Sequence, residues 1–394
     1  MELNSDQQQA FNNVVEWIAK PSSPFLTLGG YAGTGKTTLL AYIRKHLKNE
    51  KKLKKLSVSF VCYTGKAANV LKQKLDSQNA LGQDDSVSTI HHLIYKPVED
   101  EQGNIVDWVR RGMEDVAADL IVVDEGSMIN ETIWGDLLFF EKPILVVGDH
   151  GQLPPVEGRF NLMANPEIRL ETIVRQQAEN PIIRLSQMVR RGLHIPVGKF
   201  EKTVVKLPRL SPEDEQKIFA KYDENYLILC GRNATRVRLN MDVRRALGHT
   251  GAEPEKGERV ICLKNDREIN VYNGMLGWIR ELRPYRKHWY RGTIKLDGEE
   301  MFYRGKFLKN QFGLEKTIHS DRDLGILGIR TSMKKMGNLF DWGYALTVHK
   351  AQGSEAPNVI VYEERLPVYN DEIWRRWLYT AITRSSEKLV IIGS

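Results

Sequence analysis

A glycine-rich octet near the amino terminus constrains the fold of this chain more than any other feature. Residues 30–37 read Gly-Tyr-Ala-Gly-Thr-Gly-Lys-Thr, which is the G-x-x-x-x-G-K-[ST] pattern of a phosphate-binding loop. An apolar stretch at 25–28 precedes the octet, and a helix-forming stretch at 38–43 follows it. Such a loop needs this order, because its backbone N–H groups converge on phosphate at a helix N-terminus. The octet predicts an α/β domain that binds a nucleoside triphosphate; the alternative is a glycine-rich turn without a ligand.

The residues of the loop have separate expected roles. Lys36 is long enough to reach the β- and γ-phosphates, and Thr37 can offer its hydroxyl to Mg²⁺ at the start of the helix. The glycines allow successive N–H groups to point at one phosphate group. The expected nucleotide-binding residues of the loop are Gly30, Gly33, Thr34, Gly35, Lys36, Thr37 and Thr38.

Short, continuous apolar runs recur along the chain, and polar residues follow several of them. These runs are residues 58–62, 120–123, 144–147, 227–230, 359–362 and 389–392. Continuous rather than alternating hydrophobicity is typical of strands that are buried on both faces, as in parallel sheets. Ligands of such sheets collect beyond the carboxyl ends of the strands. The runs fall into an N-terminal and a C-terminal group, which predicts two α/β sheets.

Two stretches depart from this pattern. Residues 93–116 are polar, with a turn signal at 100–104 between two short strand-like runs, and we expect a β-hairpin inserted into the first α/β domain. Residues 256–338 contain short alternating strands with Asn-Gly and Asp-Gly turns, which predict a small β-barrel.

Length and charge set wider limits. A chain of 394 residues exceeds the size at which a single core keeps growing, so we expect two or more domains. The net charge of +7 fits a polyanionic partner but is also common in proteins that bind none, so it decides little. The basic run at 44–55 is typical of a solvated helix end and loop rather than of a binding groove.

Cysteine spacing and hydropathy indicate the compartment. Cys62, Cys230 and Cys262 are far apart in the sequence, which disfavours a disulfide framework or a metal cluster. The amino terminus has no signal pattern, and no apolar run approaches the ~20 residues that a membrane span needs. We therefore expect an intracellular, soluble chain.

An acidic pair follows one of the predicted strands. Asp124 and Glu125 come directly after the run at 120–123, where a P-loop enzyme places an acid near Mg²⁺ and another near the attacking water. Asp124 is then the metal-side carboxylate and Glu125 the general base. An Asp-Glu pair alone is more commonly a solvated turn, but its place behind a buried strand favours catalysis.

Three further side chains are candidates for contact with the phosphates. Gln152, in the segment 148–156, has an amide that can sense the γ-phosphate or the attacking water; the segment is otherwise a proline-stiffened loop. Arg175 and Arg384 are candidate arginine fingers. Isolated arginines are more often members of surface ion pairs.

Together these motifs occur in an order that resembles a known family. The ordered set is Gln7, GYAGTGKTT at 30–38, YTGKAA at 63–68, STIH at 88–91, DEGSM at 124–128, GDHGQLPPV at 148–156, Arg175 with Gln176, LTVHKAQGSE at 346–355 and YTAITR at 379–384. It resembles the superfamily 1B DNA helicases, above all the RecD-like and phage Dda-like members. The resemblance covers almost the whole chain, and the strings VHKAQGSE and GDHGQLPPV are highly specific.

The resemblance implies an α/β fold of two RecA-like P-loop domains with parallel sheets, which close on ATP and Mg²⁺ at their interface. Single-stranded DNA would cross both domains. The implied limits are 1–92 with 117–170 for the first domain, 93–116 for an inserted hairpin wedge, 171–255 with 339–394 for the second domain, and 256–338 for an inserted SH3-like barrel.

The resemblance also assigns roles to matching positions. Gln7 would read adenine. The remaining ATP-site residues implied beyond the loop glycines are Lys36, Thr37, Asp124, Glu125, Gln152, Arg175, Gly353, Glu355 and Arg384. The residues implied to contact the DNA strand are Thr64, Lys66, His91, Thr347, His349 and Lys350. Trp108 in the hairpin either meets the base pair at the fork or anchors the hairpin to its own domain.

The implied activity is that of an ATP-dependent DNA helicase that moves 5′→3′ along single-stranded DNA with little sequence preference. Its partners would be single-stranded and forked DNA, and single-strand-binding or replication proteins, in DNA replication, recombination or repair. The chain would work as a monomer without membrane contact, in a bacterium or a phage-infected host. Two alternatives stay open: an ATP-gated single-strand-binding translocase or clamp without processive unwinding, and an RNA-directed helicase.

Some positions depart from the family pattern or have two interpretations. Gly126 lies where relatives often carry Ala or Val, which we expect to be sterically minor. No long N-terminal extension precedes the motifs, so a nuclease or complex-assembly role gains no support. The hairpin is short for a strand-splitting wedge. Residues 283–291 interleave cations with aromatics, and the aromatics either stack bases or pack inward.

Overall fold

The computed structural model of the protein describes residues 3–51, 53–99, 105–155, 160–174, 179–264, 266, 269, 271–297, 302–331 and 336–393. Its chain divides into two compact units, Met1–Arg191 and Gly192–Ser394. The division lies just after helix α7 (Pro181–Arg190), and the boundary at 170/171 expected from the sequence stays a prediction. The finer four-part division stays a prediction.

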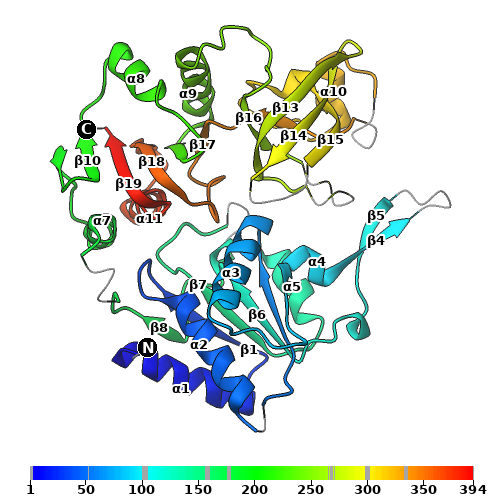
Figure 1. Ribbon diagram of the computed structural model, residues 1–394, viewed down its shortest axis with the longest axis vertical. Coiled ribbons are helices and arrows are strands. Elements are labelled where there is room, and N and C mark those ends of the chain that lie inside the picture. The colour runs from blue at the N-terminus through cyan, green and yellow to red at the C-terminus, as the bar shows by residue number, and fades with distance from the viewer. Residues whose placement is uncertain are drawn as a thin grey trace. The chain divides into compact units, whose positions relative to one another are not determined.

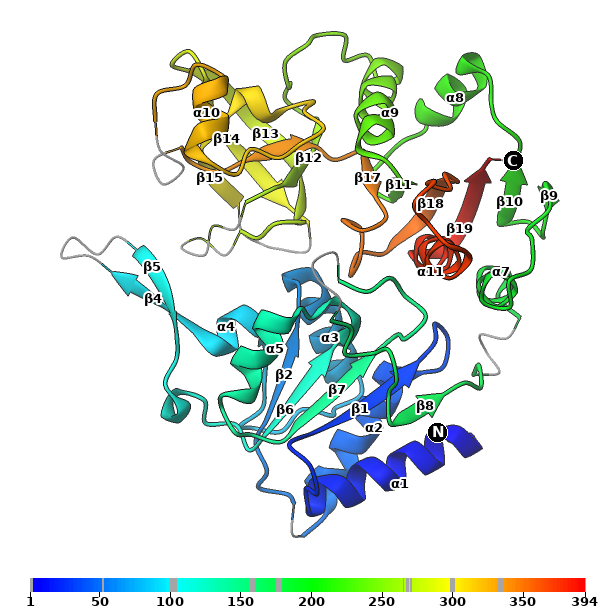
Figure 2. The same ribbon diagram turned by 180° about the vertical axis from the view of Figure 1, so that it is seen from behind.

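The first unit is built on a six-stranded parallel sheet. Its strands are β1 (Phe25–Gly30), β2 (Val58–Cys62), β3 (Ser86–Thr89), β6 (Leu120–Asp124), β7 (Ile144–Gly148) and β8 (Ile168–Leu170). Their order is β3-β2-β6-β7-β1-β8, and every neighbouring pair is parallel (Figure 2). The predicted apolar strands at 25–28, 58–62, 120–123 and 144–147 are therefore confirmed.

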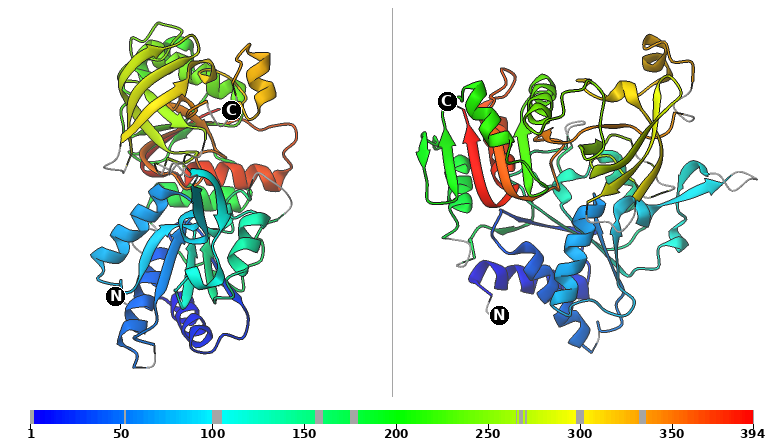
Figure 3. Two further views of the ribbon diagram at one scale, coloured as in Figure 1. Left: turned by 90° about the vertical axis from the view of Figure 1, so that its right-hand side faces the viewer. Right: turned by 45° about the horizontal axis from the view of Figure 1, so that its top comes forward.

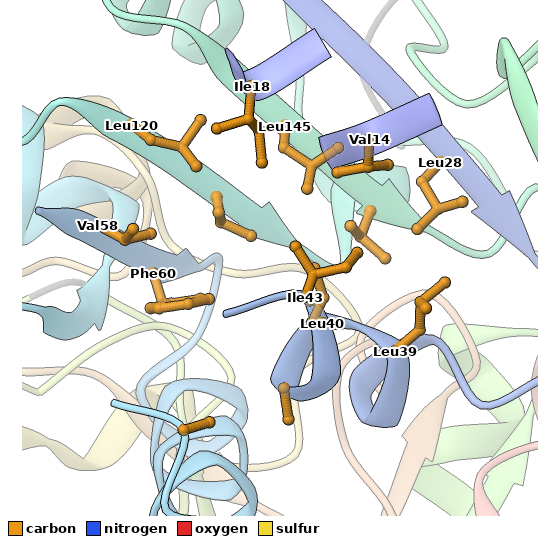
Figure 4. Packing of buried hydrophobic residues seen from close by; sticks show 14 of the residues in the cluster. Val14, Ile18, Leu28, Leu39, Leu40, Ile43, Val58, Phe60, Leu120 and Leu145 are labelled. Carbon is orange, nitrogen blue, oxygen red and sulfur yellow. The ribbon is translucent and has the colours of Figure 1, made fainter. Parts of the chain in front are cut away.

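Helices cover both faces of this sheet, which explains the continuous hydrophobicity of its strands. The helices are α1 (Ser5–Ala19), α2 (Lys36–Asn49), α3 (Gly65–Ser77), α4 (Ile90–Ile94) and α5 (Glu131–Leu138), with the short 3-10 turns η1 (Met113–Asp115) and η2 (Gly126–Met128). Leu120 and Leu145 pack with side chains of α1 and α2 on one face (Figure 4). The alternate residues Ile121 and Ile144 pack with α4 and α5 on the other.

The second unit contains another α/β layer. Its strands are β9 (Gly198–Lys199), β10 (Val204–Leu207), β11 (Tyr226–Cys230), β17 (Ala345–Thr347), β18 (Ala356–Tyr362) and β19 (Ser385–Ile392), and its helices are α8 (Pro212–Phe219), α9 (Asn233–Ala246) and α11 (Asp371–Ile382). The order is β17-β11-β18-β19-β10-β9, parallel except at β9. Strands β10, β19 and β18 lie side by side in Figure 3. The second predicted group of strands is thus confirmed.

Antiparallel strands occupy the two stretches that depart from the apolar pattern. In the first unit, β4 (Tyr95–Glu99) pairs with β5 (Ile105–Arg110) and extends away from the parallel sheet (Figure 1). In the second unit, the five-stranded sheet has the order β15-β14-β13-β12-β16. Its elements are β12 (Arg259–Cys262), β13 (Leu276–Tyr285), β14 (Trp289–Leu296), β15 (Phe302–Leu308), η3 (Lys309–Gln311), α10 (Asp321–Ile326) and β16 (Phe340–Trp342). The wedge role and the SH3-like closure stay predictions.

The basic run at 44–55 contains one residue that is not solvated. Arg44 is only 3% exposed and donates to Asp85 at 2.7 and 2.9 Å and to the Leu56 carbonyl at 3.1 Å. It lies on the same side of α2 as Leu40 and Leu47, one turn away in each direction, and that side packs against the sheet. The prediction of a solvated helix end is therefore wrong at Arg44.

A second buried ion pair joins α9 to the chain that enters the five-stranded sheet. The side chains of Arg244 and Glu258 are both fully buried. Arg244 also donates to the carbonyls of Gly251 and Glu253 at 2.7 and 2.8 Å, and its guanidinium lies 4.2 Å from the ring centroid of Trp342. The pair therefore contributes to the attachment of the five-stranded sheet to the α/β layer.

Replacing Arg244 with methionine is expected to lower the free energy of unfolding of the second unit by about 3–5 kcal/mol, because Glu258 would be left as an unpaired buried charge. Denaturant titration would measure this loss. Arg245→Met is the control, since Arg245 is the next residue of α9 and its side chain is 60% exposed. Equal effects of the two substitutions would contradict the prediction.

Candidate nucleotide site and nucleic-acid interface

The phosphate-binding loop joins β1 to α2, as the sequence predicts. Gly33 and Gly35 adopt φ values of 80° and 79°, in the left-handed region that favours glycine. A Cβ added at Gly30 would lie 2.6 Å from Thr34 Oγ1, so the first glycine is needed for close packing within the loop. Thr34 in turn is fully buried and its hydroxyl donates to the Tyr31 carbonyl at 2.8 Å. The loop is thus held in one compact conformation.

The Lys36 ammonium lies at the carbonyls of the loop. Its Nζ donates to Gly30 O at 2.7 Å and to Tyr31 O at 3.0 Å. Phosphate oxygens are stronger, charged acceptors, so they can replace these neutral carbonyls when a nucleotide binds. Thr37 and Thr38 lie half-buried in the first turn of α2, where the helix dipole favours an anion.

Gln7 is buried against the same loop. Its Nε2 donates to Thr34 O at 3.0 Å, and its Oε1 accepts from the Asn4 backbone at 3.2 Å as part of the N-terminal cap of α1. A Cβ at Gly35 would lie 2.7 Å from this amide. Both ends of the Gln7 side chain therefore bind protein atoms in this structure, and its role as the adenine reader stays a prediction.

The acidic pair lies at the carboxyl end of β6. The Asp124 carboxylate accepts from the Glu125 backbone N–H at 2.9 Å, and Glu125 has φ = 58°, which is unusual for a residue with a Cβ. Burial raises the pKa of the Asp124 carboxyl, while Lys36 and Lys74 act in the opposite direction. A desolvated carboxylate is stabilised in its charged form by a cation, so the chemistry of Asp124 suits a Mg²⁺ ligand, and its joint role with Thr37 stays a prediction.

Gly126 is more constrained than the sequence suggests. A Cβ at this position would lie 2.4 Å from Val146 Cγ1 and 3.3 Å from Val147 O. The expectation that Ala or Val here would be a sterically minor change is therefore wrong for this chain. The reason is that η2 packs directly on the end of β7, where a Cβ at Gly148 would come within 3.1 Å of Ser127 N.

The segment after β7 contacts the phosphate loop through stacked side chains, which the sequence motifs did not predict. The His150 ring lies 4.1 Å from the Tyr31 ring, and the Arg190 guanidinium of α7 lies 3.1 Å from the Tyr31 ring centroid. Burial lowers the pKa of His150 to about 4, so its imidazole is neutral near pH 7. Gln152 follows two residues later and is only 5% exposed. No sequence motif marks Arg190, because its partner is 159 positions away.

The strand order of the first sheet separates two groups of candidate residues. The phosphate loop, the acidic pair and the segment with Gln152 follow β1, β6 and β7, which are neighbours. Thr64 and His91 instead follow β2 and β3 at the other side of the sheet. Thr64 accepts from the Ala67 N–H at 3.2 Å and so caps α3, while the His91 ring lies 5.8 Å from both Tyr63 and Tyr95.

The second unit brings Arg384 next to the segment that contains Gly353 and Glu355. Arg384 is 3% exposed, and its guanidinium donates to Thr380 O at 3.2 Å and to Ser354 O at 3.4 Å. Gly353 has φ = 72°, which glycine adopts readily, and Glu355 is exposed. The candidate finger is thus held by its own unit beside this segment.

Three candidate DNA contacts of the second unit lie at the end of one edge strand and in the turn after it. Thr347 ends β17, and His349 and Lys350 lie in the turn after it, where the Val348 N–H donates to Cys230 O at 3.0 Å. Burial lowers the pKa of His349. Burial and the neighbouring Arg236 lower the pKa of Lys350 to about 8. The turn therefore contains two consecutive candidate residues, a neutral histidine and a half-buried lysine.

Other candidates lie partly or wholly outside the described residues. Arg175 and Gln176 belong to the segment 175–178, which is not described. Lys66 lies in α3 and Trp108 in β5 opposite Pro97, but their side chains are outside the description. Their roles stay predictions.

The run at 283–291 has aromatics on both faces of the five-stranded sheet. Tyr290 is 3% exposed and packs in the core beneath the sheet. Tyr285 is on the opposite face, with the Arg291 guanidinium 4.7 Å from its ring centroid. Arg291 in turn lies opposite both Arg283 and Lys306 in register, so three cations form a row across β13, β14 and β15. Inward packing is therefore confirmed for Tyr290, and base stacking by the aromatics of the opposite face stays a prediction.

Comparison with known proteins gives the family. A profile described as an AAA domain matches residues 2–202, which is half of the chain, and one described as a UvrD-like helicase C-terminal domain matches residues 343–392. An ATP-dependent RecD2 DNA helicase of Deinococcus radiodurans is 28% identical over 94% of this chain and 47% of its own length. The chain belongs to the RecD/Pif1-like helicases of superfamily 1B.

Other members of this RecD/Pif1-like group match over most of their length. The ATP-dependent DNA helicase Pif1 of Campylobacter jejuni is 24% identical over 91% of this chain and 86% of that protein. The crystal structure of a Bacteroides Pif1 helicase with ADP-AlF3 and single-stranded DNA covers 99% of this chain and 92% of that one, with a TM-score of 0.54 and 18% identity. This likeness confirms a mixed α/β fold with a RecA-like parallel sheet.

Two further facts concern the length of the relatives and the helices of this chain. The chain spans about half the length, or less, of several curated relatives that it matches. Among the helices in the described part of this RecD/Pif1-like chain, none is long and apolar enough to cross a membrane.

Proposed function

We propose that this protein is an ATP-dependent DNA helicase that moves 5′→3′ along single-stranded DNA and separates duplex DNA with little sequence preference. The observation that carries the proposal is the grouping of Lys36, the Asp124–Glu125 pair and Gln152 after three neighbouring strands of one parallel sheet. The names of relatives such as RecD2 and Pif1 support the same reaction. The Pif1 structure with ADP-AlF3 and single-stranded DNA supports ATP and single strands as ligands.

Each proposed catalytic residue has a defined task. Lys36 and the loop N–H groups bind the phosphates, and Thr37 with Asp124 would hold Mg²⁺, which neutralises charge on the phosphate oxygens. Glu125 accepts the proton of the attacking water, and Gln152 orients that water. The remaining proposed contacts are Gln7 to adenine, Arg175 and Arg384 to the γ-phosphate, and Gly353 and Glu355 to the nucleotide.

The proposed domains follow the sequence-based limits, with RecA-like domains at 1–92 with 117–170 and at 171–255 with 339–394, a wedge at 93–116 and an SH3-like barrel at 256–338. The proposed strand contacts are Thr64, Lys66, His91, Thr347, His349 and Lys350, with Trp108 at the fork. Hydroxyl, imidazole and ammonium groups after strands suit phosphate contacts, which read no base sequence. ATP affinity that differs between an open and a closed arrangement of the two domains would supply the movement.

The decisive experiment is ATP-dependent strand displacement on two matched duplexes, one with a 5′ and one with a 3′ single-stranded tail. We expect displacement from the 5′ tail alone. Displacement from the 3′ tail would overturn the direction. ATP hydrolysis that single-stranded DNA stimulates without displacement would favour a translocase or clamp, and stronger stimulation by RNA would favour an RNA-directed enzyme.

DNA affinity should depend on pH through Lys350. The neighbours that act on its pKa of about 8 are Arg236, which lowers it, and Asp341 and Cys262, which raise it. As the pH rises through this value, Lys350 loses its charge and its phosphate contact. Affinity for single-stranded DNA should therefore fall between about pH 7 and pH 9, with a salt slope smaller by about 0.7, the value for one phosphate contact.

Lys350→Arg provides the test of this assignment, because arginine stays charged across the range. Fluorescence anisotropy at each pH should show a flatter profile for the variant than for the wild type. A fall of the same size in both proteins would mean that another group titrates.

A further inference from the structure

One carboxylate holds both strands of the β4–β5 hairpin at their base. Tyr95 and Arg110 form the pair of directly opposite residues nearest the sheet. The Tyr95 hydroxyl donates to Asp136 Oδ2 at 2.5 Å, and Arg110 Nη1 donates to Asp136 Oδ1 at 2.8 Å. Asp136 lies on α5, so each of its oxygens binds a different strand of the hairpin.

A second contact keeps Arg110 in this geometry. Its guanidinium lies 3.7 Å from the ring centroid of Phe139, which follows α5 and is three residues from Asp136, on the same side of the helix. The Arg111 N–H donates to Ile94 O at 2.9 Å and closes the base of the hairpin onto α4. The Asp136 side chain is 19% exposed and that of Arg110 is 40% exposed, so the Tyr95 hydrogen bond is partly buried, whereas the Arg110 pair is open to water.

The helix that carries Asp136 is itself firmly placed. Asn130 caps α5 by accepting from the Ile133 N–H at 3.0 Å. Ile133, Trp134 and Leu137 are buried in the core beneath the parallel sheet. The same helix follows the acidic pair through the short turn η2. The hairpin is therefore attached to a rigid element of the first unit, close in sequence to the proposed general base.

We propose that Asp136 is a positioning residue for strand separation, because it fixes the direction of the hairpin relative to the parallel sheet. This inference rests on the proposed helicase function. A wedge separates base pairs only if it resists the push of the fork, and a hairpin that turns at its base would deflect instead. Two oxygens bound to two strands oppose such a turn, whereas a contact to one strand would leave it free to pivot.

Asp136→Ala should lower the rate of strand displacement roughly tenfold, since it removes two hydrogen bonds to a charged group. ATP turnover stimulated by single-stranded DNA should stay within about twofold of the wild type, because the reacting atoms are not touched. The number of base pairs opened per ATP would thus fall. The loss should be larger on GC-rich than on AT-rich duplexes, since a stable fork pushes harder on the hairpin.

The control is Asp115→Ala. Asp115 pairs with Lys96 of the same hairpin at 2.9 Å, but it contacts a side chain of one strand only, and the pair is exposed. Exposed pairs contribute little, so displacement should be unchanged. Asp136→Glu keeps the charge and Asp136→Asn keeps one acceptor, so both should recover part of the displacement that Asp136→Ala loses.

The outcomes separate this inference from the function on which it rests. If the wild type opens duplexes and Asp136→Ala opens them equally well, the positioning role is wrong and the helicase function stands. An equal loss of ATP turnover and displacement, with a lowered melting temperature, would assign Asp136 to stability instead. If the wild type opens no duplex, the proposed function fails and the inference with it.

Discussion

Lys36→Ala should lower ATP turnover stimulated by single-stranded DNA by about 10²–10³-fold, the loss typical of removing one preorganised donor from developing charge. The Lys36 ammonium contacts the carbonyls of Gly30 and Tyr31, so it already lies within the loop that would hold the phosphates. Alanine leaves the loop glycines in place but removes the only part of this side chain that can reach the γ-phosphate. Steady-state phosphate release would measure the change.

Single-strand affinity provides the internal check on Lys36→Ala. The candidate strand contacts of the first unit follow β2 and β3, away from the loop after β1, so DNA binding without nucleotide should be preserved. Lys45→Ala is the matched control, because Lys45 is an exposed lysine of the same helix. ATP turnover that persisted in Lys36→Ala would overturn the assignment of the nucleotide site.

Glu125→Gln should slow ATP hydrolysis by about 10²–10⁴-fold while ATP binding is retained, because the substitution removes a general base and keeps the side-chain volume. Asp124 keeps its carboxylate, and its hydrogen bond from the residue 125 backbone does not depend on the side chain. Glu125 is held at φ = 58°, a strained conformation of the kind that clusters at functional sites. Single-turnover hydrolysis and equilibrium ATP binding, measured separately, would test both halves of the prediction.

Glu131→Gln is the control for Glu125→Gln. Glu131 is exposed in the first turn of α5, only six positions later, and its neutralisation should leave hydrolysis nearly unchanged. If Glu125→Gln hydrolysed ATP at the wild-type rate, another group would have to be the base. If the Glu125→Gln variant failed to bind ATP, Glu125 would contribute to ATP binding rather than to the proton transfer.

Strands buried on both faces were the easiest elements to predict from the sequence. Residues 120–123 and 144–147 are continuously apolar because helices cover both faces of the sheet there. Edge strands gave no such signal. Strand β8 is three residues long with an exposed centre, and β17 is also three residues long, so neither forms a recognisable run. The parallel pairing of β8 with β1 is a long-range contact that no local pattern encodes.

The expectations that proved wrong, at Arg44 and Gly126, failed for the same physical reason. Arg44 looked solvated because its neighbours in the sequence are charged, but it faces Asp85, a residue 41 positions away. Gly126 looked replaceable because relatives often carry Ala or Val there, but Val146 of the adjacent strand occupies the space of a Cβ. Composition and local spacing report the neighbours along the chain, whereas packing depends on the neighbours in space.

The sequence by itself determined the phosphate loop, the acidic pair and the two parallel sheets, because each depends on residues within a few positions of one another or on a repeated local pattern. Only the tertiary structure decided which distant side chains meet. The stack of Arg190 on Tyr31 joins residues from separate elements, and so do the hydrogen bonds of Asp136 to both hairpin strands. Such contacts depend on the order of the strands in the sheet and on which faces the helices cover. The packing of the whole unit selects both.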